Sequence, residues 1–299
     1  MTSPAVRITN PRTDTPLLKT YVELMKLRII ELLLITTLPA MVAAAGGWPG
    51  WWPALATLQG GTRSTARASA YNQVFDGDSE RVFRRTRGRP LTTERVSPIA
   101  VKTFGVTLGA AGFFWLWATT NLLAGTLSTI GLLFYVFVYS LLLKRTTTQN
   151  IVIGGAAGAV PVLVGWAAVT NTVELPAWIM FAVVFFWTPP HFWALAIRYR
   201  EDYERAGVPM LPVVVGEKRA MDHMLAYTLV LVGTTLLLYA TGPVEWLYLT
   251  VAAAAGAAFL VGTWMLRDHP EAAMKYFGYS NVYLSVIFVA IAVDVLVLG

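Results

Sequence analysis

A run of acidic side chains stands beside a single asparagine in the first third of the chain. Asn72, Asp76 and Glu80 recur at intervals of four residues. Asp78 lies between the last two. In a helix that continued through this segment, residues four apart would share a face, and Gly77 would loosen the turn enough for Asp78 to join them. Carboxylates packed this closely repel one another unless a cation neutralises them. Oxygen ligands of this kind suit Mg²⁺, which uses one or two carboxylates together with phosphate oxygens of a substrate.

Basic residues follow the acidic segment at once, and a second pairing of acid and base occurs later in the chain. Five arginines occupy positions between 81 and 89, and guanidinium forks bind phosphate oxygens that a metal leaves uncovered. Arg198 and Asp202 repeat the pairing. A single arginine beside anionic lipid more often sets topology, and an acid at a membrane surface is often merely solvated. The combination instead favours a site for a diphosphate that carries Mg²⁺.

The sequence holds no other catalytic constellation of comparable strength. It has no Gly-x-x-x-x-Gly-Lys loop, no pair of histidines with zinc spacing and no serine elbow. It has no cysteine, which excludes thiolate metal ligands, catalytic thiols and disulfides. The basic residues behind the net charge of +6 are concentrated in the connections between apolar stretches. Nucleic acid is therefore not a predicted partner.

The elements that must position these side chains are helices in a lipid bilayer. Of the 299 residues, 56% are hydrophobic and 13% are charged, whereas about a quarter of the residues in a soluble domain are charged. Stretches of roughly 20 apolar residues recur, and each can cross a hydrocarbon core of about 30 Å as a helix. Strand-like alternation is absent, which excludes a barrel. We predict nine spans, at residues 29–46, 52–72, 97–117, 122–143, 150–169, 177–197, 221–239, 244–265 and 280–298.

The predicted fold class is therefore all-α, a polytopic membrane protein with about nine transmembrane helices. Two long polar connections follow the second and the sixth span. Because they are four spans apart, they predict two four-helix halves plus a ninth helix, the kind of internal repeat between which membrane proteins often build sites. Residues 1–25 are predicted to form a cytoplasmic tail, and residues 26–299 the membrane-embedded domain.

The distribution of basic residues predicts the orientation. Lys and Arg fall in every second connection, whereas the alternate connections around Gly47, Thr120, Asn171 and Gly242 contain none. The positive-inside rule then places the N-terminus and both acidic segments in the cytoplasm, and Gly299 outside. The predicted location is the inner (cytoplasmic) membrane of the cell.

Four segments, in order, resemble the protohaem IX farnesyltransferase (haem O synthase) family within the intramembrane (UbiA-type) prenyltransferase superfamily. The first is the Asn72 to Glu80 motif with the following Arg84-Arg-Thr-x-x-Arg-Pro-Leu91. The others are the run from Tyr139 to Asn150, with its Leu-Lys-Arg-Thr-x-x-x-Asn ending, Trp187-Thr-Pro-Pro-His-Phe-Trp-Ala-Leu-Ala196, and Asp202-Tyr-x-x-Ala-Gly-Val-Pro-Met-Leu-Pro212. The resemblance runs over nearly the whole chain.

The resemblance implies a reaction and its participants. A farnesyl group would pass from farnesyl diphosphate to a vinyl group of haem b, water would be added, diphosphate would leave and haem O would form. Asn72, Asp76, Asp78 and Glu80 would hold Mg²⁺, and Asp202 would complete the site from the other half, with Asp76, Asp202 and Asn72 as the catalytic set. The leaving group's charge would fall to Arg85, Arg89, Lys144, Arg145 and Arg198. The remaining implied partners are the lipid bilayer and a haem A synthase or oxidase assembly protein.

Three further side chains are candidates for haem binding. Ionisable residues inside a span favour function over packing. His191 stands in the Thr-Pro-Pro-His-Phe-Trp segment that resembles the family, so we expect it to contact haem, through the iron. Arg63 and Arg67 lie one turn apart in the second span, where the family has small apolar residues. Two such cations need partners in a membrane, and the candidates are Glu31, Asp76 or the haem propionates.

Two other functions stay open on the sequence alone. Another intramembrane prenyltransferase, acting on an aromatic acceptor, would share the acidic metal site but would lack the Thr-Pro-Pro-His-Phe-Trp segment. A non-catalytic haem or lipid carrier, or a transporter, would be consistent with Arg63 and Arg67.

Overall fold

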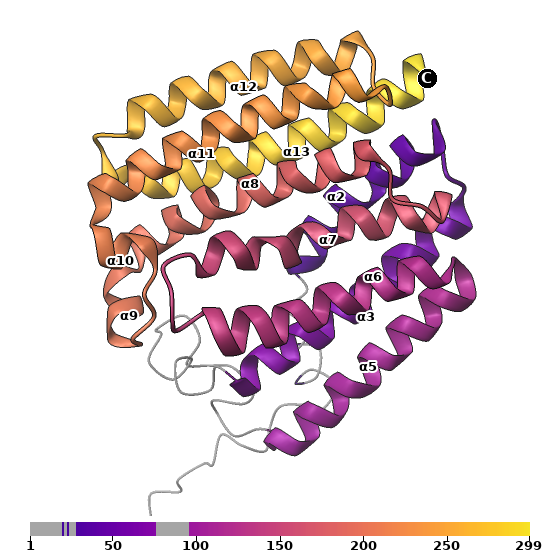
Figure 1. Ribbon diagram of the computed structural model, residues 1–299, viewed down its shortest axis with the longest axis horizontal. Helices are drawn as coiled ribbons and strands as arrows, with labels where there is room; N and C mark the ends of the chain where they lie inside the picture. The colour runs from indigo at the N-terminus through magenta and orange to yellow at the C-terminus, as the bar shows by residue number, and fades with distance from the viewer. Residues whose placement is uncertain (1–19, 21–22, 24–27, 76–95) are drawn as a thin grey trace, which may run out of the picture.

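The computed structural model describes residues 20, 23, 28–75 and 96–299, with backbone alone for residues 28–34, 65, 67–75 and 98. Within these ranges the chain forms helices and turns and contains no strand, so the all-α prediction is confirmed there (Figure 1). The elements are α2 (Arg28–Ala45), α3 (Trp51–Phe75), α5 (Pro98–Thr119), α6 (Leu122–Leu133), the π-helix η1 (Phe134–Leu143), α7 (Asn150–Thr170), α8 (Leu175–Arg198), α9 (Arg200–Arg205), α10 (Leu211–Val215), α11 (Glu217–Leu237), the 3₁₀ turn η2 (Leu238–Thr241), α12 (Trp246–Leu266), the 3₁₀ turn η3 (Pro270–Ala272) and α13 (Ala273–Leu298).

Local sequence signals set several helix ends. Ser97 precedes α5 and its hydroxyl accepts a hydrogen bond from the Ala100 amide, while Asn121 caps α6 in the same way through Ala124. Asn171 ends α7 in the left-handed region, with φ 55°. α11 and α13 begin earlier than the predicted spans. The first turn of α11 is polar, and in the first turns of α13 Lys275 and Gly278 interrupt the apolar stretch.

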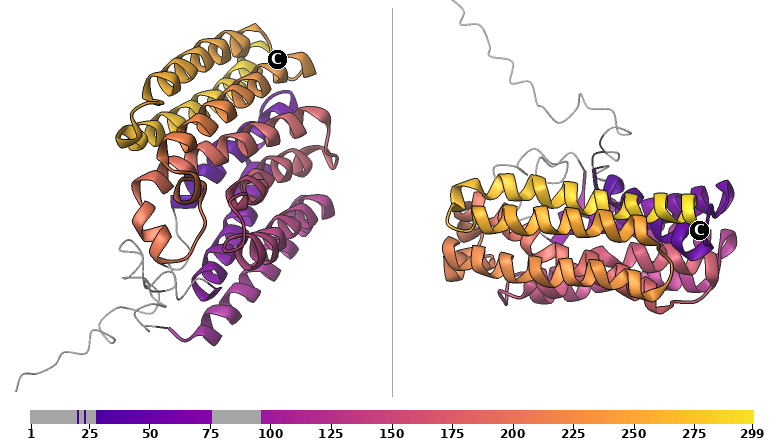
Figure 2. Two further views of the ribbon diagram at one scale, coloured as in Figure 1. Left: turned by 60° about the vertical axis from the view of Figure 1, so that its left-hand side comes forward. Right: turned by 90° about the horizontal axis from the view of Figure 1, so that it is seen from above.

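The helices run side by side as an antiparallel bundle, which Figure 2 shows from two other sides. Each long helix packs against the next one along the chain: α3 on α5, α5 on α6, α6 on α7, α7 on α8, α8 on α11 and α11 on α12. α13 packs against α12, α8 and α2, and α2 packs against both α3 and α7. The last helix therefore joins the second half of the chain to the first.

The bundle has two chemically different ends. Every Lys and Arg from residue 96 onward lies at the end where α8 passes into α9 and α10, on the left in Figure 1. At the opposite end exposed tryptophans gather, which is typical of a membrane interface. These are Trp48, Trp51, Trp52, Trp117, Trp178 and Trp246.

Seven helices in the described part of the chain are long and apolar enough to cross a membrane. α2 and α3 lie where the first two spans were predicted but are not among these seven. The apolar described part of α2 is short, Ile35–Ala45, and α3 includes the polar run around Arg63 and Arg67. The protein is therefore a polytopic membrane protein, and the count of nine spans stays a prediction.

Glycines allow the closest approaches between helices. A Cβ atom added at Gly165 of α7 would lie 2.6 Å from the Thr37 carbonyl oxygen of α2. A Cβ at Gly154 would lie 2.3 Å from the ring of Tyr139 on η1. Small residues of this kind bring helix backbones together in a bilayer, where packing rather than the hydrophobic effect drives association. α7 is thus held tightly against two neighbours in the first half.

Candidate active site

The predicted site residues fall into two groups with respect to the structure. Asp76, Asp78, Glu80, Arg85 and Arg89 lie outside the described residues, as do the side chains of Glu31, Arg67 and Asn72. The backbone of Asn72 lies in the last turn of α3. The side chains of Arg63, Lys144, Arg145, His191, Arg198 and Asp202 are described.

Asp202 lies on α9, directly beyond the end of α8. Only 5% of it is exposed. Its Oδ1 accepts a hydrogen bond from the Arg205 guanidinium, one turn further along. Arg198 at the end of α8 is exposed, and its guanidinium lies 5.8 Å from the centre of the Tyr199 ring. The carboxylate is therefore enclosed, while the neighbouring cation reaches outward.

The segment that follows Asp202 anchors it to the core. Gly207 takes a φ of 64°, a conformation that glycine adopts without strain. After this turn Val208, Met210 and Leu211 are buried. Burying these apolar side chains fixes the connection against α8 and α11, which α10 contacts, so the carboxylate is held on a rigid support.

A second polar cluster lies where η1 meets α7. Asn150 is fully buried, and its side-chain nitrogen donates to the Lys144 carbonyl oxygen over 3.3 Å. Its Oδ1 has no hydrogen-bond partner among the described residues, and neither does the buried hydroxyl of Ser140. π-helical turns often mark functional sites, and η1 brings Ser140 and the Lys144 backbone to the same junction. Asn150 Oδ1 and Ser140 Oγ thus have no hydrogen-bond partner among the described residues, and both lie near the turn that carries Lys144 and Arg145.

These segments lie at the same end of the bundle. The last turn of α3, the η1 to α7 junction and α9 all lie at the left end in Figure 1, and α3 packs against both η1 and α7. In the part of the chain that the structure describes, no three His, Asp or Glu side chains gather to hold a metal. Of the predicted ligands, only Asp202 has a described side chain.

His191 is buried in α8 between two aromatic rings. Its ring is stacked on Trp187, with centroids 4.1 Å apart, and on Phe277 of α13, with centroids 4.2 Å apart. Its Nδ1 lies 2.8 Å from the Ser280 hydroxyl. The indole nitrogen of Trp187 also donates to the Ser280 carbonyl oxygen over 2.7 Å. Phe192 approaches the ring at a right angle, with centroids 5.3 Å apart. Both faces of the imidazole are covered and Nδ1 contacts Ser280, so Nε2 is the ring nitrogen left for a ligand.

Arg63 lies in the middle of α3 and contacts the neighbouring helix α5. Its guanidinium carbon is 4.6 Å from the centre of the Trp115 ring, and a desolvated cation–π contact of this kind contributes about 2 kcal/mol. Its Nη1 is buried and has no hydrogen-bond partner among the residues described here. Trp115 is thus one partner for the Arg63 guanidinium in the membrane, and the buried Nη1 is left to donate to an anion.

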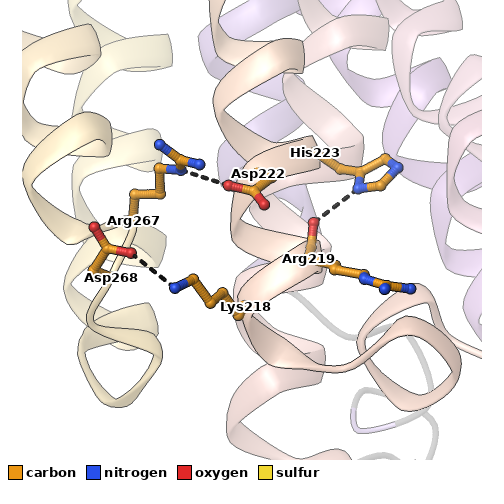
Figure 3. A network of polar contacts seen from close by, with 6 residues as sticks. All are labelled: Lys218, Arg219, Asp222, His223, Arg267 and Asp268. Carbon is orange, nitrogen blue, oxygen red and sulfur yellow. Dashed lines mark hydrogen bonds and ion pairs between the residues drawn. The ribbon is translucent and has the colours of Figure 1, made fainter.

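A separate ion-pair network ties α11 to α12 at the basic end (Figure 3). The Arg267 Nε lies 2.5 Å from Asp222, and the Lys218 ammonium lies 3.6 Å from Asp268. The hydrogen bond and charge of Asp222 raise the pKa of Arg267 above its usual value. Exposed pairs contribute little to stability. Because these cations already have carboxylate partners, they are poor candidates for a substrate anion.

Sequence reasoning missed the surroundings of His191. Ser280 and Phe277 lie about 90 positions from it in the chain, so only packing of α13 on α8 brings them together. The signal in the sequence is weak, because Ser280 is a polar residue at the start of an apolar stretch, which is typical of a span boundary.

Comparison with known proteins places this arrangement in context. Residues 33–287 match the model of the UbiA prenyltransferase family. A protein named protoheme IX farnesyltransferase 2 from Saccharopolyspora erythraea is 53% identical over 289 residues, which cover 95% of this chain and 88% of that protein. A protein named protoheme IX farnesyltransferase from Mycolicibacterium smegmatis is 48% identical, covering 95% of this chain and 93% of that protein.

Solved structures share the fold. A structure of digeranylgeranylglyceryl phosphate synthase superposes with a TM-score of 0.78 at 20% identity, covering 93% of this chain and 98% of that one. A UbiA homologue from Archaeoglobus fulgidus, bound to DMAPP and Mg²⁺, superposes with a TM-score of 0.65 at 18% identity, covering 92% of this chain and 99% of the other. At these identities the likeness concerns the arrangement of helices.

Proposed function

The chain belongs to the UbiA prenyltransferase family and is a prenyltransferase, and we propose that it farnesylates haem b to give haem O. Farnesyl diphosphate is the proposed donor, a vinyl group of haem b the acceptor, and diphosphate the leaving group. The observation that carries the proposal is the 53% identity, over 95% of the chain, to a protein named for protohaem IX farnesylation. The buried His191 gives an independent reason to favour haem over another aromatic acceptor.

We propose that Mg²⁺ binds between the two acidic segments. Asn72, Asp76, Asp78 and Glu80 would hold it from one segment, and Asp202 from the other. Asp202 fits this role, because its carboxylate is buried, is a hard oxygen donor, and uses only Oδ1 in its hydrogen bond to Arg205. When bound, the ion would screen the charge of the diphosphate.

The cations at the same end would bind the diphosphate itself. Lys144 and Arg145 follow the π-helix, and Arg198 ends α8; Arg85 and Arg89 are the proposed partners from the first connection. Guanidinium and ammonium groups stabilise the charge that develops on a leaving phosphate. Asn150 would orient Lys144 within this cluster of cations, since its side-chain nitrogen donates a hydrogen bond to the Lys144 carbonyl oxygen.

For haem we propose contacts inside the bundle. His191 would face the iron, and Arg63 with Arg67 would bind the propionates. Replacing both arginines with alanine separates this role from packing on Trp115. Weaker haem binding at an unchanged melting temperature supports propionate binding. A lower melting temperature with unchanged haem affinity makes the pair structural.

The proposed setting is the inner (cytoplasmic) membrane, with the basic end of the bundle in the cytoplasm. The proposal is supported by the Lys and Arg from residue 96 onward, which lie at alternate helix ends, because the positive-inside rule assigns such ends to the cytoplasm. A haem A synthase or an oxidase assembly protein is the proposed recipient of the product.

The test is product analysis with the purified protein in liposomes. With farnesyl diphosphate, Mg²⁺ and haem b, we expect the mass of haem O and one diphosphate released for each haem O formed. Asp76→Asn should abolish the product while the protein still inserts and purifies normally. Unmodified haem, together with prenylation of an added aromatic acceptor, would replace this proposal with the alternative prenyltransferase.

A further inference from the structure

The contacts of Ser280 determine which nitrogen of His191 carries the proton. The Ser280 hydroxyl donates to the Phe277 carbonyl oxygen, three residues earlier in α13, over 2.9 Å. Serines in helices commonly bond back to the preceding turn in this way. A hydroxyl has one hydrogen, so Ser280 Oγ can only accept from its other close neighbour. That neighbour is Nδ1 of His191, at 2.8 Å; when the hydroxyl donates to Phe277, Nδ1 is the nitrogen that carries the proton.

The rest of the environment keeps Ser280 and the imidazole in register. Trp187 lies one turn before His191 in α8, stacks on its ring and donates to the Ser280 carbonyl oxygen. Phe277 covers the other face of the ring, and its carbonyl accepts from Ser280. The ring can neither flip nor tilt without breaking one of these contacts. Nε2 consequently has a fixed direction, and it has no hydrogen-bond partner among the described residues.

We propose that Ser280 is a positioning residue: it holds His191 as the Nδ1-protonated tautomer and leaves the Nε2 lone pair to bind the iron of haem b. This inference rests on the proposed function for the identity of the ligand. Metal-binding histidines usually donate their second ring nitrogen to an oxygen acceptor, which fixes the tautomer and makes the ligating nitrogen more basic. The Ser280 hydroxyl supplies that acceptor from a different helix.

The tautomer can be measured without haem and without turnover. The chain has three histidines, so His223→Gln with His269→Gln leaves His191 as the single signal in protein labelled with ¹⁵N-histidine. We expect a proton coupled to Nδ1 and a bare Nε2, and we expect Ser280→Ala to convert this single form into a mixture. A proton on Nε2 in the unmodified site would overturn the proposal.

Titration with ferric haem b tests the consequence. We expect Ser280→Ala to weaken haem binding by about tenfold or more, the usual effect of removing such a partner, and Ser280→Thr, which keeps the hydroxyl, to restore most of the affinity. Tyr283→Phe is the matched control, because it removes another buried hydroxyl from the same helix that bonds to Thr235 instead; it should leave haem binding unchanged.

The outcomes separate the two proposals. If His191→Ala weakens haem binding but Ser280→Ala does not, the positioning role is wrong and the proposed function is unaffected. If neither variant alters haem affinity, His191 does not bind the iron and the inference fails. Absence of haem O in the product assay, with the expected tautomer and the expected haem affinities, would count against the reaction alone.

Discussion

The buried polar groups of this bundle differ sharply between its two sides. Across α11, α12 and α13 they are paired: Tyr276 with Thr228 at 2.8 Å, Tyr283 with Thr235 at 2.9 Å, and Asp294 with two backbone amides at the start of α12. From α3 to α9, several buried polar atoms have no partner among the described residues. These are Thr57 Oγ1, Arg63 Nη1, Ser140 Oγ, Asn150 Oδ1, Trp166 Nε1, Trp193 Nε1 and Arg200 Nε.

This difference separates stability from function. An unpaired buried polar group costs about 1 to 3 kcal/mol, and a bilayer offers no water to compensate. Such groups persist where a ligand or its water completes them. We therefore expect substitutions of the paired groups Thr228, Thr235, Tyr276, Tyr283 and Asp294 to lower stability without altering chemistry. Substitutions on the α3 to α9 side, where the unpaired groups and Asp202 lie, should instead alter ligand binding or turnover without lowering stability.

The largest effect is expected at Asp202. Asp202→Asn removes the charge of a buried carboxylate at the proposed metal site, so farnesyl transfer should fall by at least about 100-fold, the scale of losing one preorganised electrostatic contact. The melting temperature should stay within about 2 °C. Initial rates and thermal unfolding measure both. Glu201→Gln and Glu204→Gln, which alter exposed acids on the same helix, are the controls and should be silent. A similar loss of farnesyl transfer in Arg205→Gln would indicate that the reaction depends on the ion pair between Asp202 and Arg205 rather than on Asp202 as a metal ligand.

Asp294 is expected to affect stability and not turnover. It is fully buried, and its carboxylate accepts from the amides of Glu245 at 2.5 Å and Tyr248 at 2.7 Å, so it caps α12 from α13. Asp294→Ala should cost about 2 to 3 kcal/mol, because charged hydrogen bonds are lost and buried donors exposed. Thermal unfolding checks this, with the exposed Asp268→Ala as control. A loss of turnover per folded molecule at an unchanged melting temperature would show that Asp294 acts in the chemistry and not in stability.

Asn150 tests the unpaired side more finely. Asn150→Ala frees the Lys144 backbone, and we expect the KM for farnesyl diphosphate to rise by about tenfold, equivalent to about 1.4 kcal/mol. Steady-state kinetics with varied farnesyl diphosphate measure it. Gln149→Ala, at the exposed neighbouring position, should behave like the parent. If the substitution instead lowers stability as much as Asp294→Ala does, Asn150 belongs with the structural groups.

The smallest effect is expected for the hydroxyl pair between α11 and α13. Tyr283 donates to Thr235 over 2.9 Å, and hydrogen bonds between membrane helices contribute about 0.6 kcal/mol on average. A double-mutant cycle of Tyr283→Phe and Thr235→Val should give a coupling energy near that value, with kinetics unchanged. If the two substitutions are coupled in their effect on the turnover rate rather than on stability, the assignment of this hydroxyl pair to the structural side of the bundle is wrong.

Much of the architecture could be predicted because bilayer physics constrains it. Apolar stretches of the length of a membrane gave the helices, and basic residues gave the alternation of the ends. The π-helix η1 was not predicted, because its residues are apolar like those of α6 before it, and hydropathy does not distinguish a π-helix from an α-helix. The early start of α13 at Ala273 was not predicted because Lys275 and Gly278 interrupt the apolar stretch in its first two turns.

The candidate site could be predicted only where its residues are close in sequence. The motif around Asp202 and the buried Asn150 were visible as patterns. The pairing of His191 with Ser280, and of Arg63 with Trp115, depends on which helices pack together, which local periodicity does not specify. The acidic run from Asp76 to Glu80 lies outside the described residues and stays a prediction.

One measurement compares the two sides directly: the rise in melting temperature caused by farnesyl diphosphate with Mg²⁺. A ligand that binds only the folded state stabilises it in proportion to its affinity. We predict the same rise for the parent protein and for Asp294→Ala, whose starting temperature is lower, and little or no rise for Asp202→Asn. An undiminished rise in Asp202→Asn, or its loss in Asp294→Ala, would contradict the assignment of ligand binding to the unpaired side of the bundle.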